Sequence, residues 1–362
     1  MVNANPIQLS VVVAVRNAGD ALNAALTSID GSDLPREIFE IIVVDDASDD
    51  ASASLASRYA DAVIRLAGKA AGPAYARNRG AELARGSFIA FVDADVVVRQ
   101  DTLRRMLVAL NGDNSLDVVS ARYAGTPADR GLVSEYWNLL LTYGDERAPR
   151  SAAYLAGGCV MMRRALFDST GMFDEWRFRA PYLEDVEFGQ RLADRGSRVG
   201  TLPGLEVTHL RRTTARRMLH DVWQRSELLA RSLGYRRTRA SAPNDVVFAL
   251  NGAAIPAVVM SAAVLLSAAS GPGRHWSENL AVALIIAGLM NLPACIFFSR
   301  RRGPALALLL LPLHMIAQAT AVAALTVGWL LRDTIGDRIP DATMQAFAEV
   351  GVEMWPPVPK RN

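Results

Sequence analysis

Three long segments in the last third of the chain contain no Asp, Glu, Lys or Arg. They are residues 246–270, 280–299 and 304–331. Each is long enough to cross a lipid bilayer, because a membrane-spanning helix needs about 20 apolar residues. Buried core helices are the alternative, but three such runs separated only by short polar loops favour membrane spans. We therefore predict C-terminal α-helical transmembrane segments.

Basic residues are concentrated next to the first of these segments. Residues 211–239 hold nine arginines against Asp221 and Glu227. Such clusters favour the cytoplasmic side of a membrane and anionic lipid headgroups. Residues 300–302, between the second and third segments, are also all arginine. With three spans, this pattern predicts a cytoplasmic N-terminal domain and an external C-terminus.

The chain is too long for a single compact core, because it has 362 residues. We expect a soluble domain, a basic amphipathic juxtamembrane region, three membrane helices and a tail, at residues 1–210, 211–244, 245–331 and 332–362. Within the basic region, residues 214–233 place Trp and Leu on one face of a helix. This face suits either the membrane interface or packing on the soluble domain.

Two further features concern the compartment. The first ten residues have neither the charged start nor the apolar core of a cleaved signal peptide. Cys159 and Cys295 are the only cysteines, and the second lies within an apolar segment. This fits a reducing compartment and implies no disulfide framework.

The soluble part alternates β-branched runs with helical segments. Strands are predicted at residues 9–15, 38–44, 62–66 and 88–92, and helices at residues 21–29 and 75–85. This alternation predicts an α/β fold with a doubly wound, mostly parallel sheet. Sheets of this kind bind ligands outside the carboxyl ends of their strands.

Acidic residues follow two of the predicted strands. Asp45 and Asp46 end the run EIIVVDD, and Asp93 and Asp95 follow the run SFIAFV. Carboxylates are suitable ligands for Mg²⁺ or Mn²⁺, which bridge phosphates. Two acids in a polar turn are the simpler explanation for Asp93 and Asp95 alone, but the second acid-ended strand favours a metal and a nucleotide.

Six motifs in order and register resemble those of family 2 glycosyltransferases, which have a nucleotide-sugar-binding GT-A fold. They are SVVVAVRN, VVDDASDD, GPAYARNRG, FVDAD, LAGGCVMMRR and LEDVEFGQRLADRG, and they lie within residues 9–209. The segment THLRRTTARRML, followed by apolar runs, resembles bacterial membrane-bound members that build exopolysaccharides or lipid-linked glycans.

The resemblance implies donor-binding roles for the acids. Asp95 matches the metal ligand of the family, and Asp93 would lie at the ribose or at the metal and its bound water. Asp46 would accept a hydrogen bond from the base of the donor, while Asp45 braces the loop. Uracil and guanine both offer an N–H, so UDP- and GDP-sugars both remain possible. Helix capping is the alternative role for Asp46.

Further positions follow from the same resemblance. Asp185 matches the catalytic base, although acids in a first helical turn are also ordinary partners of the helix dipole. Gly157 and Gly158 leave room for the donor sugar. Arg77 and Arg79 either reach the pyrophosphate or are solvated. For His209, a capped or solvated ring is favoured over contact with the metal or the pyrophosphate.

Two departures from the family pattern bear on specificity. Residues 14–17 read Ala-Val-Arg-Asn where the family usually has Pro-Thr-Tyr-Asn, which leaves the donor base open. The QxxRW motif of processive synthases is absent, and this favours transfer of a single sugar.

The predicted function is that of a metal-dependent inverting glycosyltransferase. It would move one sugar to a lipid-linked or growing glycan acceptor at the inner leaflet of the cell membrane, with a multi-pass anchor and a cytoplasmic catalytic domain. A polyprenyl-phosphate glycosyl synthase is the alternative enzyme, and an inactive membrane scaffold of a glycan-assembly machine is the non-enzymatic one. Expected partners are membrane lipids and a homo-oligomer or glycan-assembly complex, and no nucleic acid.

Overall fold

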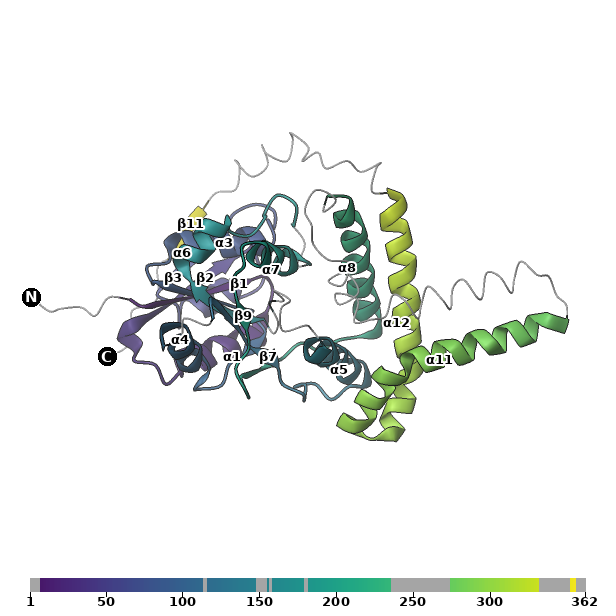
Figure 1. The fold of residues 1–362 in the computed structure, drawn as a ribbon. Coiled ribbons are helices and arrows are strands. Elements are labelled where there is room, and N and C mark those ends of the chain that lie inside the picture. Colours follow the sequence, from purple (N-terminus) through teal and green to yellow (C-terminus); the bar gives the residue numbers. More distant parts are fainter. Residues whose placement is uncertain are drawn as a thin grey trace, which may run out of the picture. The chain divides into compact units, whose positions relative to one another are not determined.

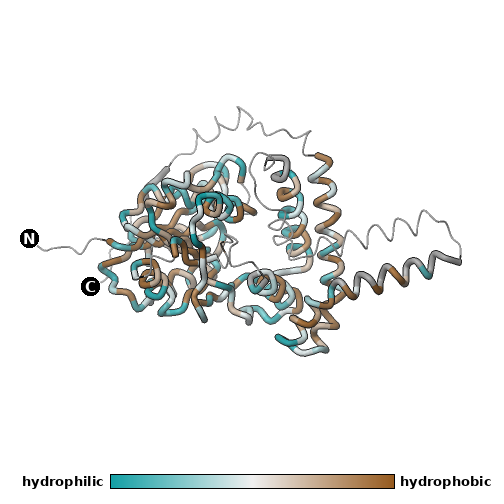
Figure 2. The backbone as a smooth tube through the Cα atoms, in the orientation of Figure 1, coloured by the Kyte–Doolittle hydropathy of each residue, from teal (hydrophilic) through white to brown (hydrophobic). Residues whose placement is uncertain are grey.

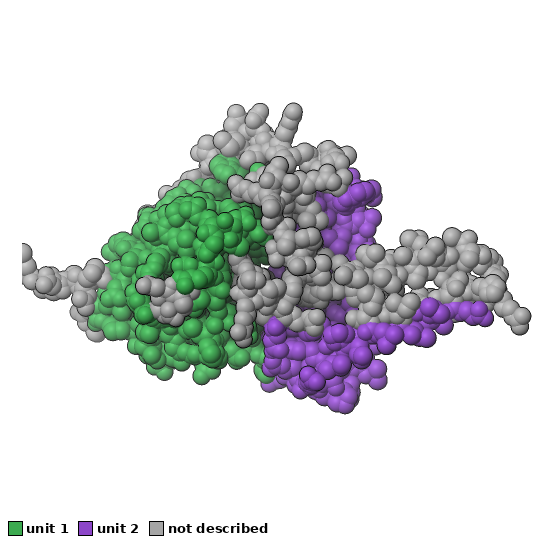
Figure 3. Space-filling view, viewed as in Figure 1, with its two compact units in different colours: residues 1–128, 149–211, 338–362 green, residues 129–148, 212–337 purple. Residues whose placement is uncertain are grey.

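The computed structural model describes residues 7–112, 116–147, 155, 158–178, 182–235, 274–331 and 352–355. It divides into two compact units, coloured separately in Figure 3. Unit 1 comprises residues 1–128, 149–211 and 338–362, and unit 2 comprises residues 129–148 and 212–337. Gly157 and the predicted span 246–270 lie outside the described residues.

Unit 1 is built on an eight-stranded sheet of order β11-β3-β2-β1-β4-β8-β6-β9 (Figure 1). Its strands are β1 (Leu9–Val15), β2 (Phe39–Asp45), β3 (Ala62–Leu66), β4 (Phe88–Val92), β6 (Val118–Ser120), β8 (Cys159–Arg163), β9 (Val199–Gly200) and β11 (Val352–Trp355). The four strands β3, β2, β1 and β4 run parallel, whereas β8 runs antiparallel to β4 and β6. The predicted α/β fold with a mostly parallel sheet is confirmed.

Helices cover both faces of this sheet because its strands are apolar on both sides. Val11 and Val13 of β1 belong to one apolar cluster and Val12 belongs to another, as expected where side chains alternate between faces. The first cluster includes residues of α1 (Gly19–Asp30), α2 (Ser52–Ala56) and α4 (Thr102–Gly112). The second includes residues of α3 (Pro73–Leu83), α6 (Arg164–Thr170) and α7 (Glu184–Asp194). Figure 2 shows the apolar strands between these helices.

A second sheet has three strands in the spatial order β5-β10-β7. Its strands are β5 (Val96–Val97), β10 (Glu206–His209) and β7 (Arg122–Tyr123), and a short 3-10 helix (Arg36–Ile38) precedes β2. His209 pairs with Val96, the residue that follows Asp95. The small sheet therefore brings the end of β10 to the acids that follow β4.

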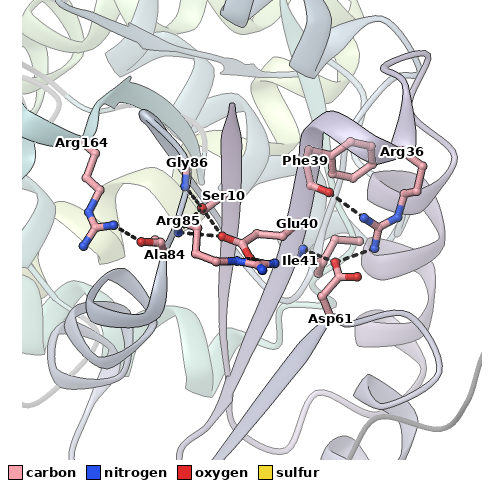
Figure 4. A network of polar contacts seen from close by, with 10 residues as sticks. All are labelled: Ser10, Arg36, Phe39, Glu40, Ile41, Asp61, Ala84, Arg85, Gly86 and Arg164. Carbon is pink, nitrogen blue, oxygen red and sulfur yellow. Dashed lines mark hydrogen bonds and ion pairs between the residues drawn. The ribbon is translucent and has the colours of Figure 1, made fainter. Parts of the chain in front are cut away.

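A buried carboxylate links the amino ends of the central strands, at the end of the main sheet opposite those acids (Figure 4). Glu40 of β2 is 3% exposed and accepts hydrogen bonds from the Ser10 hydroxyl at 2.6 Å and from the backbone N–H of Arg85 at 2.7 Å. The Arg85 guanidinium reaches the second oxygen of Glu40. The backbone N–H of Gly86 donates to Ser10. One side chain thus holds β1, β2 and the turn before β4 in register.

Replacing Glu40 by Ala is expected to lower the free energy of unfolding by about 3 kcal/mol, because it leaves buried donors without an acceptor. Asp30→Ala is the matched control, since Asp30 forms an exposed ion pair with Arg36 at 3.2 Å. That change should cost less than about 1 kcal/mol. Denaturant unfolding of both variants measures the difference, and equal losses would show that Glu40 adds no more than a surface ion pair.

The C-terminal strand β11 closes the other edge of the main sheet. Val352–Trp355 pairs antiparallel with β3, and Val352 lies opposite Leu66 and Trp355 opposite Val63. A strand hydrogen-bonded to the main sheet cannot lie on the far side of a membrane from it. The prediction of an external C-terminus opposite a cytoplasmic N-terminal domain is therefore wrong.

The helices described in unit 2 are α5 (Leu132–Arg147), α8 (Ala215–Tyr235), α11 (Arg274–Arg302) and α12 (Pro304–Leu331). Its core joins Tyr136 and Leu139 of α5 to Met218 of α8, Phe298 of α11 and Leu310 of α12. The predicted amphipathic segment forms α8, which runs alongside α12 (Figure 1). Its apolar face thus contacts another helix of unit 2.

The apolar segments of unit 2 differ in how well they support membrane crossing. Residues 280–299 lie within α11, and residues 304–331 form α12. Among the described residues, α12 is the one helix that is both long and apolar enough to cross a bilayer. A single helix of this kind is weak evidence for a span, so the predicted three-span, multi-pass region is not confirmed.

A buried polar chain links three of these helices. The Tyr136 hydroxyl of α5 lies 2.9 Å from Nδ1 of His314, and the other ring nitrogen of His314 lies 3.2 Å from the Gln318 amide. Gln318 in turn exchanges hydrogen bonds with Asn291 of α11. All four side chains are at most 3% exposed. Because buried polar groups need partners, this chain fixes the register of α5, α11 and α12.

Candidate active site

The candidate site lies at the carboxyl ends of β1, β2 and β4, where the acids predicted from the sequence come together. The backbone is strained around this edge. Asn17, Ala47 and Leu183 have φ between 52° and 68°, a region that costs a non-glycine residue energy. Asn17 follows β1, Ala47 follows β2, and Leu183 precedes α7. Strain of this kind is concentrated at functional sites, so it marks the same edge independently of the acids.

The carboxylates of Asp45 and Asp46, at the end of β2, both accept hydrogen bonds from backbone N–H groups. Asp45 is fully buried, accepts a hydrogen bond from the N–H of Ser48 and pairs with Arg65 at 3.6 Å. Its burial raises its pKa above the ordinary value, although Ser48 and Arg65 oppose this. Asp46 accepts hydrogen bonds from the N–H groups of Ala71 and Gly72 at 2.7 and 2.8 Å. Asp46, predicted to contact the donor base, therefore also anchors the loop that starts α3.

Arg77 joins the acids of two different elements. Its guanidinium donates to Oδ1 of Asp93 and to Oε1 of Glu184, both at 2.7 Å. Burial raises the pKa of Asp93 and of Glu184, and the charge of Arg77 acts against this rise in both. The Arg77 guanidinium, for which contact with a pyrophosphate is one of the two predicted roles, thus forms ion pairs with two carboxylates. Arg79, predicted with it, pairs with Glu82 and Glu175.

Asp95 lies next to His209. The Asp95 carboxylate is 3.2 Å from Nε2 of His209, whose side chain is 13% exposed and whose ring stacks on Tyr123 at 5.0 Å. Burial alone would raise the pKa of Asp95, but the hydrogen bond and charge of His209 and the charge of Arg211 outweigh it and hold the pKa below its ordinary value. His209 therefore does not occupy the solvated position favoured from the sequence.

Asp185 is the more accessible of the two acids that open α7. It is half-buried, and its carboxylate accepts a hydrogen bond from the N–H of Val186 at 2.8 Å. Glu184 is 5% exposed and is committed to Arg77. Phe188, one turn further on, packs against Phe167 and Phe173, which fixes α7 on the sheet. The two acids thus face different surroundings, and Asp185 is the one open to a reacting group.

Gly158 makes room beside Asp93. Its φ is +57°, and a Cβ built there would lie 2.7 Å from the Asp93 carboxylate, 2.9 Å from the Tyr123 hydroxyl and 3.0 Å from Val96. The backbone carbonyl of Gly158 also accepts a hydrogen bond from the N–H of Asp93 at 2.8 Å. A side chain at this position would therefore displace the acid predicted to meet the donor.

Gly158→Ala is expected to lower nucleotide-sugar turnover at least tenfold, because the added methyl group forces Asp93 and Tyr123 to move and strains the backbone by about 1–3 kcal/mol. Gly204→Ala is the matched control, since Gly204 has a similar φ of +64° but no atom within 4 Å of its Cβ position. Steady-state kinetics and thermal unfolding of both variants separate the effects. Equal activity loss in the two variants would assign the effect of Gly158 to backbone strain alone.

The residues present suit a divalent cation that takes most of its ligands from phosphate and water. Within the described residues there is no group of three or more His, Cys, Asp or Glu that could hold a metal. Asp95 and His209 form a two-residue donor set with a carboxylate whose pKa is lowered. One or two carboxylates are usual for Mg²⁺ bound with a substrate phosphate, and Asp95 supplies one. The donor set therefore fits such a cation.

Three residues of the site were not predicted with these roles. Tyr123 stacks on His209, Glu184 receives Arg77, and Asn17 accepts a hydrogen bond from the N–H of Asp49, which links the loops after β1 and β2. Only Asn17 had a local signal, because it follows a β-branched run in a position that favours a turn. The contacts of Tyr123 and Glu184 join residues more than 80 positions apart.

The same part of the chain matches a known family. The model described as Glycosyl transferase family 2 covers residues 10–171, which include Asp46, Arg77, Asp93 and Asp95. Residues 10–171 therefore form a glycosyl transferase family 2 domain. Its family 2 domain lies within unit 1 except for residues 129–148.

Relatives of this family 2 domain are enzymes of several bacteria. The chain is 29% identical over 216 residues to a pre-mycofactocin glycosyltransferase of Mycobacterium tuberculosis, which covers 58% of this chain and 44% of that protein. It is 38% identical over 122 residues to the succinoglycan biosynthesis protein ExoO of Rhizobium meliloti, or 31% of this chain and 34% of that one. The chain thus spans less than half the length of either relative.

A solved structure supports the fold. A mannosyltransferase of Pyrobaculum calidifontis, in complex with GDP-Man and Mn²⁺, aligns with a TM-score of 0.56 over 91% of this chain and 89% of its own. The two sequences are 19% identical. At this identity the likeness concerns the fold alone, and it agrees with the GT-A-type sheet predicted for this family 2 domain.

Proposed function

We propose that unit 1 transfers a single sugar from a nucleotide-sugar donor, with a divalent cation, to a lipid-linked or growing glycan acceptor, and inverts the anomeric configuration. The observation that carries this proposal is the meeting of two acid groups at one edge of the sheet. Asp95 lies with His209, and Asp93 is joined through Arg77 to the helix that presents Asp185. The match of residues 10–171 to the glycosyl transferase family 2 model supports this chemistry.

The donor side of the site would use the ends of β2 and β4. Asp46, held against Ala71 and Gly72, would accept a hydrogen bond from the base, and Asp93 would lie near the ribose. Gly157 and Gly158 would leave space for the sugar, although the structure describes only the second. The structural relative from Pyrobaculum calidifontis holds GDP-Man and Mn²⁺, which supports a nucleotide-sugar and a divalent cation here. UDP- and GDP-sugars remain equal candidates.

Asp95 and His209 would hold the cation, with Asp93 close by. A bound divalent cation would neutralise the charge that develops on the departing diphosphate. Asp95 contributes a fixed negative charge at this position because its pKa is held below the ordinary value by His209 and Arg211 against the effect of burial. Stacking on Tyr123 keeps the His209 ring in place beside it.

Asp185 would take the proton from the acceptor hydroxyl as that oxygen attacks the anomeric carbon. A single in-line displacement needs one base and no covalent sugar intermediate, and it inverts the configuration. Arg77 binds Glu184 at 2.7 Å, and this ion pair would keep Glu184 from acting as the base. Because Arg77 also binds Asp93, it would set the distance between the donor side and the base.

The proposed acceptor and location are supported by the sequence and by one relative. The arginines of residues 211–239 and the apolar surface of unit 2 support work at the inner leaflet of the cell membrane, on a lipid-linked or glycan acceptor. ExoO, a relative, acts in succinoglycan biosynthesis, as its name states, which supports a polysaccharide-related acceptor. The absent QxxRW motif supports single-sugar transfer.

A donor panel tests this function. Full-length protein in detergent would be given UDP- and GDP-sugars with Mn²⁺, Mg²⁺ or excess EDTA, and release of the nucleoside diphosphate would be measured. We expect release from one donor class in the presence of a cation and none in EDTA. Asp117→Ala, an exposed acid paired with Arg198, is the control that should leave release unchanged. No release from any donor with either cation would overturn the proposal.

A further inference from the structure

The two faces of α12 differ sharply in their surroundings. Leu309, Ile316, Ala323 and Leu330 are exposed and lie seven residues apart, so they form one stripe along the helix. Of the thirteen large apolar side chains that are exposed within the described residues, ten lie on α11 and α12. A monomeric soluble protein rarely exposes apolar side chains in such a concentration. The stripe therefore marks an interaction surface.

The opposite face of α12 is covered by a charged helix. A Cβ at Gly328 would lie 2.4 Å from the carbonyl oxygen of Glu227 and 2.9 Å from Cβ of Ala230, so α8 and α12 touch through their backbones. In this stretch α8 carries Asp221, Arg225, Glu227 and Arg231, and Glu227 pairs with Arg231. Wherever α12 lies, these four charged residues lie alongside it.

This pairing is incompatible with a simple crossing of the bilayer by α12. If α12 spanned the hydrocarbon core, the adjoining part of α8 would enter it as well, and charged residues at that depth are strongly disfavoured. An α12 that lies in the interface avoids this energetic cost, because its apolar face enters the lipid while the charged residues of α8 stay in water. Trp329 of α12 is 51% exposed, and an exposed tryptophan is typical of that boundary.

The C-terminal strand gives an independent reason. β11 pairs with β3 of the catalytic sheet, so the chain after α12 is on the same side as unit 1. The 20 residues between α12 and β11 include six charged residues, which leaves no further apolar run for a return crossing. An α12 that made the third of three crossings would put β11 on the wrong side.

We propose that α12 lies along the surface of a lipid bilayer and does not cross it. Its Leu309–Ile316–Leu330 stripe enters the boundary between headgroups and acyl chains, and α8 stays on the aqueous side. Arg300, exposed just before α12 begins, is placed to meet anionic headgroups, whereas the neighbouring Arg301 pairs with Glu146. The inference deepens the membrane association in the proposed function and specifies its geometry.

Depth measurements on full-length protein test this geometry. Cysteines introduced one at a time at Leu309, Ile316, Ala323 and Leu330 would carry spin labels in liposomes of phosphatidylcholine and phosphatidylglycerol. Cys295 would be changed to Ser, Cys159 would stay because it is only 1% exposed, and a variant with Cys159 alone would measure background labelling. Accessibility to oxygen and to a nickel chelate reports the depth of each label. Residues 309 and 330 are about 31 Å apart along the helix, enough to separate the two arrangements. Arg216→Cys, exposed on α8, is the aqueous control.

We expect all four α12 labels at one shallow depth and the Arg216→Cys label in water. Deep labels at 316 and 323 between shallow ones at 309 and 330 would show a spanning helix and overturn the proposal. The proposal would also be overturned if the α12 labels were as accessible to the nickel chelate as the Arg216→Cys label, or if only a second copy of the chain shielded them. In either case lipid would not cover the stripe. Donor turnover in the same samples is read separately, so its loss would count against the proposed function and not against the docking geometry.

A binding measurement gives the second test. Leu309→Glu with Ile316→Glu should reduce binding to these liposomes at least tenfold, because two charges enter the stripe that contacts lipid. Val108→Glu is the matched control, since Val108 is 60% exposed on α4 of unit 1. Unchanged binding of the double variant, or an equal loss in the control, would overturn the assigned surface.

Discussion

Asp185→Asn is expected to lower the rate of sugar transfer by about 10² to 10⁴, the usual effect of losing a general base. The amide keeps the size of the carboxylate and still accepts the hydrogen bond from Val186, but it cannot take a proton. Donor binding should survive because Asp46, Asp93 and Asp95 are unchanged. Single-turnover transfer rates, with donor affinity measured by titration calorimetry, check both parts.

Asp194→Asn is the matched control for this change. The same Asp-to-Asn change is made on the same helix, but Asp194 is exposed at the far end of α7. It should leave transfer within a factor of two. Near wild-type transfer by Asp185→Asn would assign the base to another acid, and loss of donor binding would make Asp185 a structural residue.

Asp95→Ala is expected to lower transfer by about 10² to 10³, because a key electrostatic stabiliser of the leaving group is lost. His209 alone remains of the two-residue donor set, so the affinity for Mn²⁺ should also fall. Titration of the cation against turnover measures both effects. Full turnover of the wild-type protein in excess EDTA, or an unchanged cation requirement in Asp95→Ala, would contradict this account.

The parallel core was predictable because its signals are local. The run from Leu9 to Val15 and the run from Phe88 to Val92 are rich in β-branched or aromatic residues, bounded by turn residues, and buried on both faces in the structure. The acids after β2 and β4 then had to meet at one edge, because parallel strands share their carboxyl ends. The same reasoning placed Asp46, Asp93 and Asp95 in the site.

The connections across the site were not predictable from local patterns. Arg77 looks like an ordinary helical arginine in the sequence, and its two carboxylate partners lie 16 and 107 positions away. His209 meets Asp95 across 114 positions, through a strand of four residues that is too short to carry a clear period. Such contacts depend on the packing of the small sheet and α7 against the main sheet.

The C-terminal part shows the opposite error, in which a strong local signal was read too simply. The uncharged run 304–331 does form one long helix, but composition could not reveal that α8 lies along it. Val352–Trp355, four residues of the tail, extend the main sheet, and a run this short has no pattern that predicts a strand. The charge rule therefore put the tail on the wrong side.

The anomeric configuration of the first product tests the central claim most directly. Full-length protein would be given its donor and acceptor, and the coupling constant of the anomeric proton would be followed by NMR before any mutarotation. A single displacement with Asp185 as the base predicts a product whose configuration is opposite to that of the donor, and no such product from Asp185→Asn on the same timescale. A product that retains the donor configuration would contradict the account.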